Sequence, residues 1–183
     1  MINEEDYIEL WLIGGGYASN VWLIYHIEDE KFYAIKKRNS IDVDEFIKLR
    51  DREIKNYSKI DHPFLSKFYG ITKNNHYLVF EYINGETLSN TDFSTYSKTD
   101  IFSIFIQILS VFEYLHENHF IYRDLNPRNI MIDTNKIAVL IDFDRMISNE
   151  ELNNNHTNDF YGIEYIAPEV NSGNFTNKCD IYS

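Results

Sequence analysis

The sequence has little cysteine, little proline and no long apolar run. Its 183 residues include one cysteine, Cys179, and three prolines. A single cysteine excludes an internal disulfide framework and a cysteine-only metal site, and it suits a reducing compartment. No apolar stretch reaches the roughly 20 residues of a membrane helix, and the acidic start at 1–6 has no apolar segment of a secretory signal. We therefore expect a cytoplasmic protein, with the nucleus as the alternative, and no membrane partner.

Basic residues are also scarce, because 17 Lys and Arg stand against 29 Asp and Glu, for a net charge of -12. Without a basic surplus to neutralise phosphates, the chain is not expected to bind nucleic acid. The charge still allows a local basic pocket for a nucleotide. Hydrophobic residues make up 44%, which predicts a globular chain, and the length suits one domain.

Short runs rich in β-branched and aromatic residues predict five strands in the first part of the chain. They cover 7–13, 21–25, 32–35, 66–71 and 76–82. Helical spacing of apolar residues predicts a helix over 43–60, which Pro63 stops. Gly14 to Gly16 and the pair Asn74-Asn75 predict turns.

The second part begins with a predicted helix over 101–115, where apolar residues recur at three- and four-residue steps. Thr99 with Asp100 can cap its start. Two short apolar strands follow, over 130–132 and 137–141. The order of elements predicts an α+β protein in two parts, with the boundary near Asn84-Gly85.

The loop Tyr122-Arg123-Asp124-Leu125-Asn126-Pro127-Arg128-Asn129 carries the strongest functional signal. It places Asp124 and Asn129 five residues apart, and a second acid follows at Asp142. Two carboxylates and an amide suit hard cations that take oxygen ligands. These groups could hold a nucleoside triphosphate, its metal ions and an attacking hydroxyl, although a lone Asp in a loop is normally a turn former.

The order Arg-Asp-Leu-x-Pro-x-Asn, then Ile141-Asp142-Phe143, then Ala167-Pro168-Glu169 resembles the eukaryotic protein kinase family. The resemblance covers about 7–183. It implies a two-lobed α+β fold, with a five-stranded sheet and one helix in an N-lobe of about 7–84, and a partial, mainly helical C-lobe of about 85–183.

Asp180-Ile181-Tyr182-Ser183 resembles the start of the long C-lobe helix of that family. We therefore expect the kinase domain at 1–183 to be incomplete at its C-terminus, and Glu169 to lack the Arg that normally pairs with it. The same reasoning predicts an exposed apolar patch, marginal stability and weak activity at best.

The resemblance implies transfer of a phosphoryl group from ATP, with Mg²⁺, to a protein hydroxyl, in the Ser/Thr rather than the Tyr class. Asp124 would be the catalytic base, and Asn129 and Asp142 the metal ligands. Lys36 would grip the α- and β-phosphates with Glu53 as its ion-pair partner. The ordinary alternatives are a solvated strand-end lysine, which is how Lys37 and Arg38 are read, and a surface glutamate.

Three further features of the resemblance concern the nucleotide: a glycine-rich turn, a sandwich around adenine and a hinge. The implied nucleotide-binding residues are Ile13, Gly14, Gly15, Gly16, Ser19, Val21, Ala34, Lys36, Glu81, Ile83 and Met131. The backbone of Glu81 and Ile83 would hydrogen-bond adenine, and Phe80 would close the back of the pocket. The ordinary alternatives are a glycine turn between two strands, which is common, and core packing for the apolar residues that would contact the adenine ring.

Several positions depart from the family pattern. Ser19 replaces a third glycine, Asn126 stands where a phosphate-binding Lys is usual with Arg128 as the expected compensation, and Asp144 replaces a Gly. Gly162 occupies the place that separates Ser/Thr from Tyr specificity.

These departures keep two alternatives open. One is a pseudokinase that binds nucleotide or a partner. The other is a small-molecule phosphotransferase, against which Ala167-Pro168-Glu169 argues.

Thr157 is a candidate phosphorylation site, and its phosphate would pair with Arg123. An unmodified loop is the equal alternative. Besides the protein substrate, a regulatory partner protein is left open.

Overall fold

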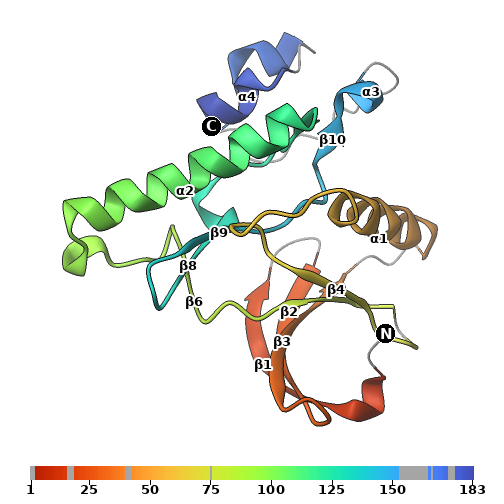
Figure 1. Cartoon of the computed structure of the whole chain (residues 1–183). Helices are drawn as coiled ribbons and strands as arrows, with labels where there is room; N and C mark the ends of the chain where they lie inside the picture. Colours follow the sequence, from red (N-terminus) through yellow and green to blue (C-terminus); the bar gives the residue numbers. More distant parts are fainter. Residues whose placement is uncertain are drawn as a thin grey trace. The chain divides into compact units, whose positions relative to one another are not determined.

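The computed structural model describes residues 3–15, 19–39, 43–74, 76–152, 165, 167–172 and 176–183. They form two compact units (Figure 1). The first unit is Met1–Lys59 with Ser66–Ile83, and the second is Ile60–Leu65 with Asn84–Ser183. Predicted features at Gly16, Asn75, Thr157 and Gly162 lie outside the described residues.

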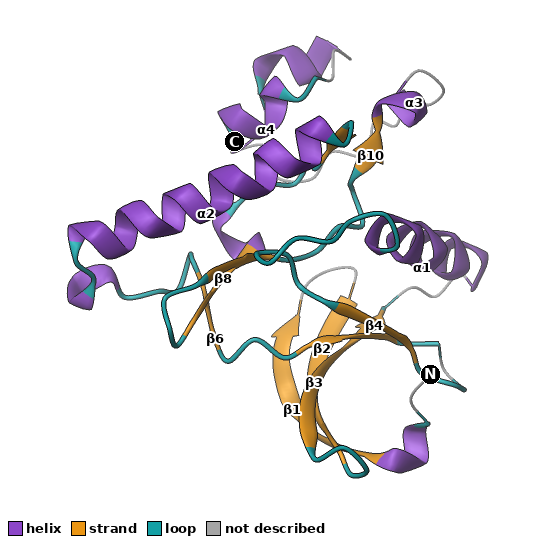
Figure 2. Ribbon diagram, viewed as in Figure 1, coloured by secondary structure: helices purple, strands orange, loops and turns teal. Residues whose placement is uncertain are grey.

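The first unit is a curved, five-stranded antiparallel sheet with one long helix (Figure 2). After a short 3-10 helix, η1 (Glu4–Asp6), come β1 (Tyr7–Gly15), β2 (Ser19–His26), β3 (Lys31–Arg38), α1 (Val43–Tyr57), β4 (Phe68–Ile71) and β5 (Leu78–Glu81). The strand order is β1-β2-β3-β5-β4. The five strands and single helix predicted for this part of the chain are therefore confirmed.

Two boundaries in the first unit differ from the prediction. Gly14 and Gly15 continue β1 instead of forming a turn, because Gly14 pairs with Val21 and Gly15 with Asn20 across an irregular register. Helix α1 ends at Tyr57 rather than near 60. There the Ser58 hydroxyl donates to the carbonyl of Lys55, a local bond that competes with helix continuation.

Alternation along β3 separates the core of this unit from its polar face. Tyr33 and Ile35 pack with Ile24 and Val79 in a buried cluster. Lys36 has the opposite parity, and its side chain reaches Glu53 on α1. The strand thus presents a buried lysine to the helix while its other face fills the apolar core.

The second unit combines small antiparallel sheets with helix α2 (Lys98–Glu117). Strands β6 (Gly85–Thr87), β8 (Ile130–Asp133) and β9 (Ala138–Leu140) form one sheet, and β7 (Phe120–Ile121) pairs with β10 (Ile147–Ser148). The short helices are η2 (Phe93–Thr95), η3 (Pro127–Asn129), α3 (Asn149–Leu152), η5 (Pro168–Ser172) and α4 (Lys178–Tyr182). The predicted hairpin is present as β8 and β9. The extra strand β6 requires glycine, since a Cβ on Gly85 would lie 2.0 Å from the carbonyl oxygen of Ile132.

Helix α2 begins earlier than predicted, and the expected cap at Thr99 is wrong. Ser97 is the N-cap: its hydroxyl accepts from the N–H of Asp100, whose carboxylate accepts from the N–H of Ser97. This reciprocal box satisfies two backbone donors at the helix start. One side of α2 is buried against β7 and β9, and the side chain of Gln107 accepts from the N–H of Ala138 at 2.7 Å.

Within the described ranges, no helix is long and apolar enough to cross a membrane.

Candidate active site

One buried carboxylate holds the loop that follows β7. Asp180 of α4 is only 1% exposed. Its Oδ1 accepts a 2.8 Å hydrogen bond from the N–H of Arg123, and its Oδ2 accepts from the N–H of Tyr122 and contacts Nε2 of His116, both at 2.9 Å. A carboxylate that accepts several hydrogen bonds in a buried place is a rigid anchor. Sequence reasoning placed Asp180 only at a helix start and missed this contact.

Tyr122 fixes the same loop from its other side. Its fully buried ring contacts Phe143 with ring centroids 5.3 Å apart, and its hydroxyl donates to the carbonyl of Ile141 at 2.6 Å. Tyr122 and Arg123, the two residues before Asp124, are therefore both held in place. Arg123 itself adopts the left-handed backbone region, with φ of 70°, which costs energy and is found most often where surrounding contacts hold a functional loop.

Asp124 and Asn129 are brought together by the turn η3. The side-chain nitrogen of Asn129 donates both to the carbonyl of Asp124, at 2.9 Å, and to its carboxylate Oδ2, at 2.8 Å. Asn126 caps η3, because its amide oxygen accepts from the N–H of Arg128 and its amide nitrogen donates to the Asp124 carbonyl. These bonds orient the Asp124 carboxylate, and they leave the amide oxygen of Asn129 as the atom suited to a hard cation.

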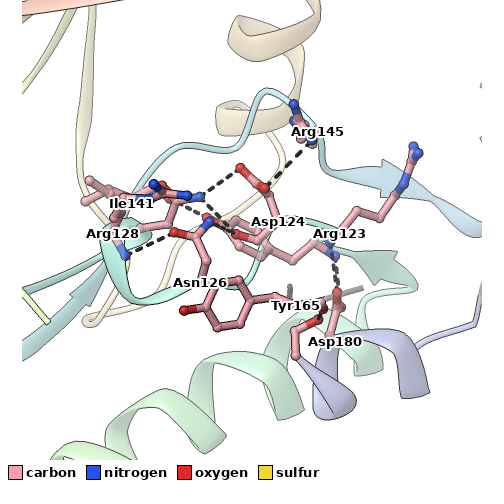
Figure 3. Close-up of polar contacts among 11 residues, drawn as sticks. Arg123, Asp124, Asn126, Arg128, Ile141, Arg145, Tyr165 and Asp180 are labelled. Carbon is pink, nitrogen blue, oxygen red and sulfur yellow. Dashed lines mark hydrogen bonds and ion pairs between the residues drawn. The ribbon is translucent and has the colours of Figure 1, made fainter. Parts of the chain in front are cut away.

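A cation that sequence reasoning did not single out lies beside Asp124. Nη1 of Arg145 is 3.8 Å from Oδ1 of Asp124, and Figure 3 shows Arg145 and Asp180 approaching the loop from opposite sides. Arg128, the expected compensation for Asn126, is exposed. The turn after Phe143 directs Arg145 back to the loop, while the role predicted for Arg128 stays a prediction.

The electrostatics of Asp124 combine burial with neighbouring charges. Burial raises the pKa of its carboxyl to about 6, while Arg145 and the Asn129 hydrogen bond act in the opposite direction. The charges of Asp142 and Asp144 add to the upward shift. A carboxylate with a raised pKa accepts a proton more readily than an ordinary surface Asp.

Asp142 lies next to this network. The N–H of Ile141 donates to the carbonyl of Asn129 at 2.9 Å, and Asp142 has a φ of 62°. Among the described residues no group of three or more His, Cys, Asp and Glu side chains could hold a metal. One carboxylate and one amide oxygen instead fit Mg²⁺, which keeps waters and takes further oxygens from phosphates.

In the first unit, Glu53 is fully buried between two cations. Its Oε1 accepts from Nζ of Lys36 at 2.8 Å, and its Oε2 accepts from Nη2 of Arg38 at 2.7 Å. The predicted pair of Lys36 and Glu53 is present. The interpretation of Arg38 as a solvated residue is wrong, because Arg38 has the same parity in β3 as Lys36 and only 3% of its side chain is exposed. Lys37, of opposite parity, instead contacts Glu9 and lies over the Trp22 ring.

The remaining predicted nucleotide residues divide between the two units. In the first, Gly14, Gly15 and Ser19 lie at the ends of β1 and β2, close to Ile13 and Val21. Ala34 is buried opposite Phe80 in the sheet register. The N–H of Glu81 donates to the carbonyl of Lys67, so only its carbonyl could serve a ligand. Ile83 ends this unit, and Met131 lies half-buried on β8 of the second.

Comparison with known proteins agrees with this geometry. A family model described as "Protein kinase domain" matches residues 7–183. The chain is 32% identical to serine/threonine-protein kinase PrkC of Bacillus subtilis (strain 168), over 95% of this chain and 28% of PrkC. It is 34% identical to serine/threonine-protein kinase Sgk1-A of Xenopus laevis, over 90% of this chain and 40% of that protein. A third relative, AtPK1/AtPK6 of Arabidopsis thaliana, is 31% identical over 94% of this chain and 38% of its own length.

A sheet and helix that carry a buried Lys–Glu pair in one unit, and an ordered Asp–Asn loop followed by a second acid in the other, are the features of the two-lobed kinase fold. The chain belongs to the protein kinase domain family. It spans between 28% and 40% of the length of these three relatives. Members of this family generally use ATP and Mg²⁺ and act on proteins.

Proposed function

We propose that this chain transfers the γ-phosphoryl group of ATP to a Ser or Thr hydroxyl of a protein substrate. The observation that carries the proposal is the geometry of Asp124. Its carboxylate is held by Asn129, faces Arg145, and lies one residue from the backbone anchored by Asp180. Such preorganisation is the main contribution that a protein makes to phosphoryl transfer.

Asp124 would accept or orient the proton of the attacking hydroxyl. A general base must be held within hydrogen-bond reach of that proton, and it must stay in one orientation. Asn129 provides the orientation, since its amide nitrogen bridges the carbonyl and the carboxylate of Asp124. Asp142 follows β9, and we assign it to cation binding rather than to proton transfer.

The residues present fit ATP and Mg²⁺. Lys36 would hold the α- and β-phosphates, and its buried partner Glu53 keeps the ammonium in a fixed position. The amide oxygen of Asn129 and the carboxylate of Asp142 would ligate Mg²⁺. When bound, the nucleotide and cation supply the phosphoryl group and neutralise its charge.

The Ser/Thr class is supported by the three relatives named above, each of which is described as a serine/threonine-protein kinase. The segment from Tyr165 to Glu169 resembles the Ser/Thr form. A peptide-library screen tests this assignment: phosphate on Ser or Thr is expected, and phosphotyrosine alone would overturn it. We also propose a cytoplasmic location, which suits a sequence with a single cysteine.

Nucleotide binding is tested by thermal unfolding of residues 1–183 with and without saturating ATP and Mg²⁺. A ligand that binds only the folded state raises the melting temperature. We expect a rise that depends on Mg²⁺ in the wild type and is reduced in Asp142→Asn, with Asp92→Asn, an exposed carboxylate outside the site, as the control. An unchanged melting temperature in the wild type would contradict the proposal. A rise without phosphate transfer would instead favour a pseudokinase.

A further inference from the structure

The loop of Asp124 has a neutral residue where the family resemblance expects a phosphate-binding cation. That residue is Asn126, and the structure shows what its side chain does instead. Its amide oxygen accepts from the N–H of Arg128, and its amide nitrogen donates to the carbonyl of Asp124, both at 3.0 Å. Both ends of the side chain thus shape the turn η3. A side-chain cation for the transferring phosphoryl group therefore has to come from another position.

Two arginines of the second unit could supply that charge, and their surroundings differ. Arg128 lies on η3 and is exposed. Arg145 has only 25% of its side chain exposed, and its Nη1 lies 3.8 Å from Oδ1 of Asp124. Figure 3 shows this contact as a dashed line between Arg145 and the Asp124 carboxylate. The structure thus places Arg145, rather than Arg128, beside the candidate base.

The two carboxylate oxygens of Asp124 have different partners. Oδ2 accepts a 2.8 Å hydrogen bond from the amide nitrogen of Asn129, whereas Oδ1 faces Arg145. The bond to Asn129 engages Oδ2, so we expect Oδ1 to receive the hydroxyl of the substrate. Arg145 is then next to the oxygen at which the reaction takes place.

Reaction geometry brings the phosphorus within reach of this guanidinium. A base holds its hydroxyl at roughly 3 Å, and an attacking oxygen lies roughly 3–3.5 Å from the atom that it attacks. The γ-phosphorus would therefore lie within roughly 6.5 Å of Oδ1 of Asp124. The guanidinium of Arg145 has five N–H donors in a flat fork, so it can face Asp124 and donate to a phosphoryl oxygen at once.

The charges around the loop also favour a cation at this place. The negative charges of Asp142 and Asp144 raise the pKa of the Asp124 carboxyl, and the charge of Arg145 lowers it. A triphosphate that binds here meets three acidic groups. A Mg²⁺ ion held by Asp142 would offset part of this repulsion, and Arg145 adds a second positive charge.

We propose that Arg145 is a catalytic residue that donates hydrogen bonds to the oxygens of the transferring γ-phosphoryl group. This inference rests on the proposed phosphotransferase function and adds a group to the same site. In the step, Asp124 accepts the proton of the attacking hydroxyl, whose oxygen bonds to the γ-phosphorus. ADP leaves with the electron pair of the broken P–O bond. Arg145 stabilises the negative charge on the phosphoryl oxygens throughout.

Nucleotide affinity separates contact with the γ-phosphate from a role that acts only through Asp124. Titration calorimetry of residues 1–183 with Mg²⁺ measures the dissociation constants of ADP and of a non-hydrolysable ATP analogue. Arg145→Ala should weaken binding of the analogue about 5- to 10-fold and leave ADP within about twofold. Arg145→Lys, which keeps the charge, should lose less than about threefold.

Two further variants serve as references in the same titration. Asp124→Asn should keep the wild-type preference for the analogue over ADP, because Arg145 is still present to contact the γ-phosphate. Lys98→Ala removes an exposed cation from α2 of the same unit and should change neither affinity. The retained ADP affinity of Arg145→Ala verifies that this variant is folded.

Phosphate transfer to a peptide is measured on the same proteins. Arg145→Ala should lower kcat about tenfold. Added guanidinium ion, at concentrations well below those that unfold the wild type, should recover several-fold of the lost rate. The same addition should not raise the rate of Lys98→Ala, which has lost no group of the site.

An Arg145→Ala variant that keeps the wild-type preference for the analogue would overturn the inference even if its kcat falls, because Arg145 would then act only through Asp124. An equal loss of both ligands would overturn it as well, since the role of Arg145 would be structural. If Arg128→Ala alone loses the preference, Arg128 is the phosphate-binding cation. Failure of the proposed function gives a different result: a wild type that binds the analogue and transfers no phosphate. A wild type that binds neither nucleotide contradicts both proposals.

Discussion

The Oδ1 atom of Asp180 accepts a 2.8 Å hydrogen bond from the backbone N–H of Arg123, which directly precedes Asp124. The two residues are 57 positions apart in the sequence. Through this bond and the parallel one to Tyr122, a short helix that contains no catalytic group determines where the candidate base lies. The active-site loop is thus ordered by the far end of the second unit.

Replacing Asp180 by Asn should reduce both stability and turnover. The amide retains one acceptor, but its NH₂ group cannot accept from the N–H of Tyr122. We expect a loss of roughly 2–4 kcal/mol in the free energy of unfolding, because a buried donor is left unsatisfied. Urea unfolding and phosphate transfer to a peptide measure the two effects. Asp92→Asn, at an exposed cap of η2, is the matched control, and equal losses in both variants would contradict the anchoring role.

Lys36 and Arg38 provide a matched pair of cations on Glu53. Lys36→Met and Arg38→Met each remove one of the two cations that hydrogen-bond to the buried carboxylate, so we expect both to lower stability by about 1–3 kcal/mol. Only Lys36→Met should also abolish turnover, because Lys36 alone is expected to hold the phosphates. Turnover measured below each variant's melting temperature separates the two effects. An inactive Arg38→Met variant together with an active Lys36→Met variant would assign phosphate binding to Arg38 instead of Lys36.

Arg145 should matter more for turnover than Arg128. Its guanidinium lies 3.8 Å from the carboxylate of Asp124, whereas Arg128 is exposed. Arg145→Ala is expected to lower kcat about tenfold, which corresponds to about 1.4 kcal/mol. Arg145→Lys should retain most of the rate, because it keeps the charge. A larger loss in Arg128→Ala than in Arg145→Ala would restore the assignment made from the sequence.

The N-terminal box of α2 should make stability depend on pH in the acid range. The Lys136 ammonium, together with the bonds to Ser97, lowers the pKa of Asp100 to about 2. A folded-state pKa below the unfolded value of 3.8 stabilises the fold above about pH 4, and this contribution is lost as the pH falls towards 2.

The comparison of wild type with Asp100→Asn tests this dependence. The difference between their urea midpoints should be constant from pH 7 to pH 5 and should shrink towards pH 3. It should also fall at high salt, since the pair is on the surface. Asp61→Asn, an exposed Asp outside the helix, measures the general effect of removing a carboxylate. A difference that does not change with pH would contradict the prediction.

What the sequence could predict was local. Asp124, Asn129 and Asp142 stand in a recognisable order, and strand alternation gives Lys36 the same face as Ala34. The same alternation applies to Arg38, two residues further on, so its contact with Glu53 could have been found from the pattern. The N-cap at Ser97 was also predictable, because Ser-x-x-Asp at 97–100 resembles a capping box. The helix predicted from apolar spacing began only at residue 101.

What the sequence could not predict depends on contacts between distant segments. Nothing around Asp180 indicates that its carboxylate turns towards Tyr122 and Arg123, because this geometry exists only once α4 packs beside the loop. The proximity of Arg145 to Asp124 likewise depends on the turn after Phe143 and on the φ of Asp142. The second apolar face of α2 is visible in the sequence as a helix that is apolar on nearly every side, but which face is packed follows only from the fold.

The central claim is that this chain transfers phosphate through Asp124, and one measurement tests it most directly. Residues 1–183 and the variant Asp124→Asn are incubated with γ-labelled ATP, Mg²⁺ and a Ser/Thr peptide library, and their thermal shifts with ATP are measured in parallel. We expect labelled peptide with the wild type and at least a thousandfold less, on the order of the loss of a base together with its positioning, with Asp124→Asn. Both proteins should show the same ATP-dependent shift. Equal labelling by the two proteins, or none by a wild type that binds ATP, would contradict the account.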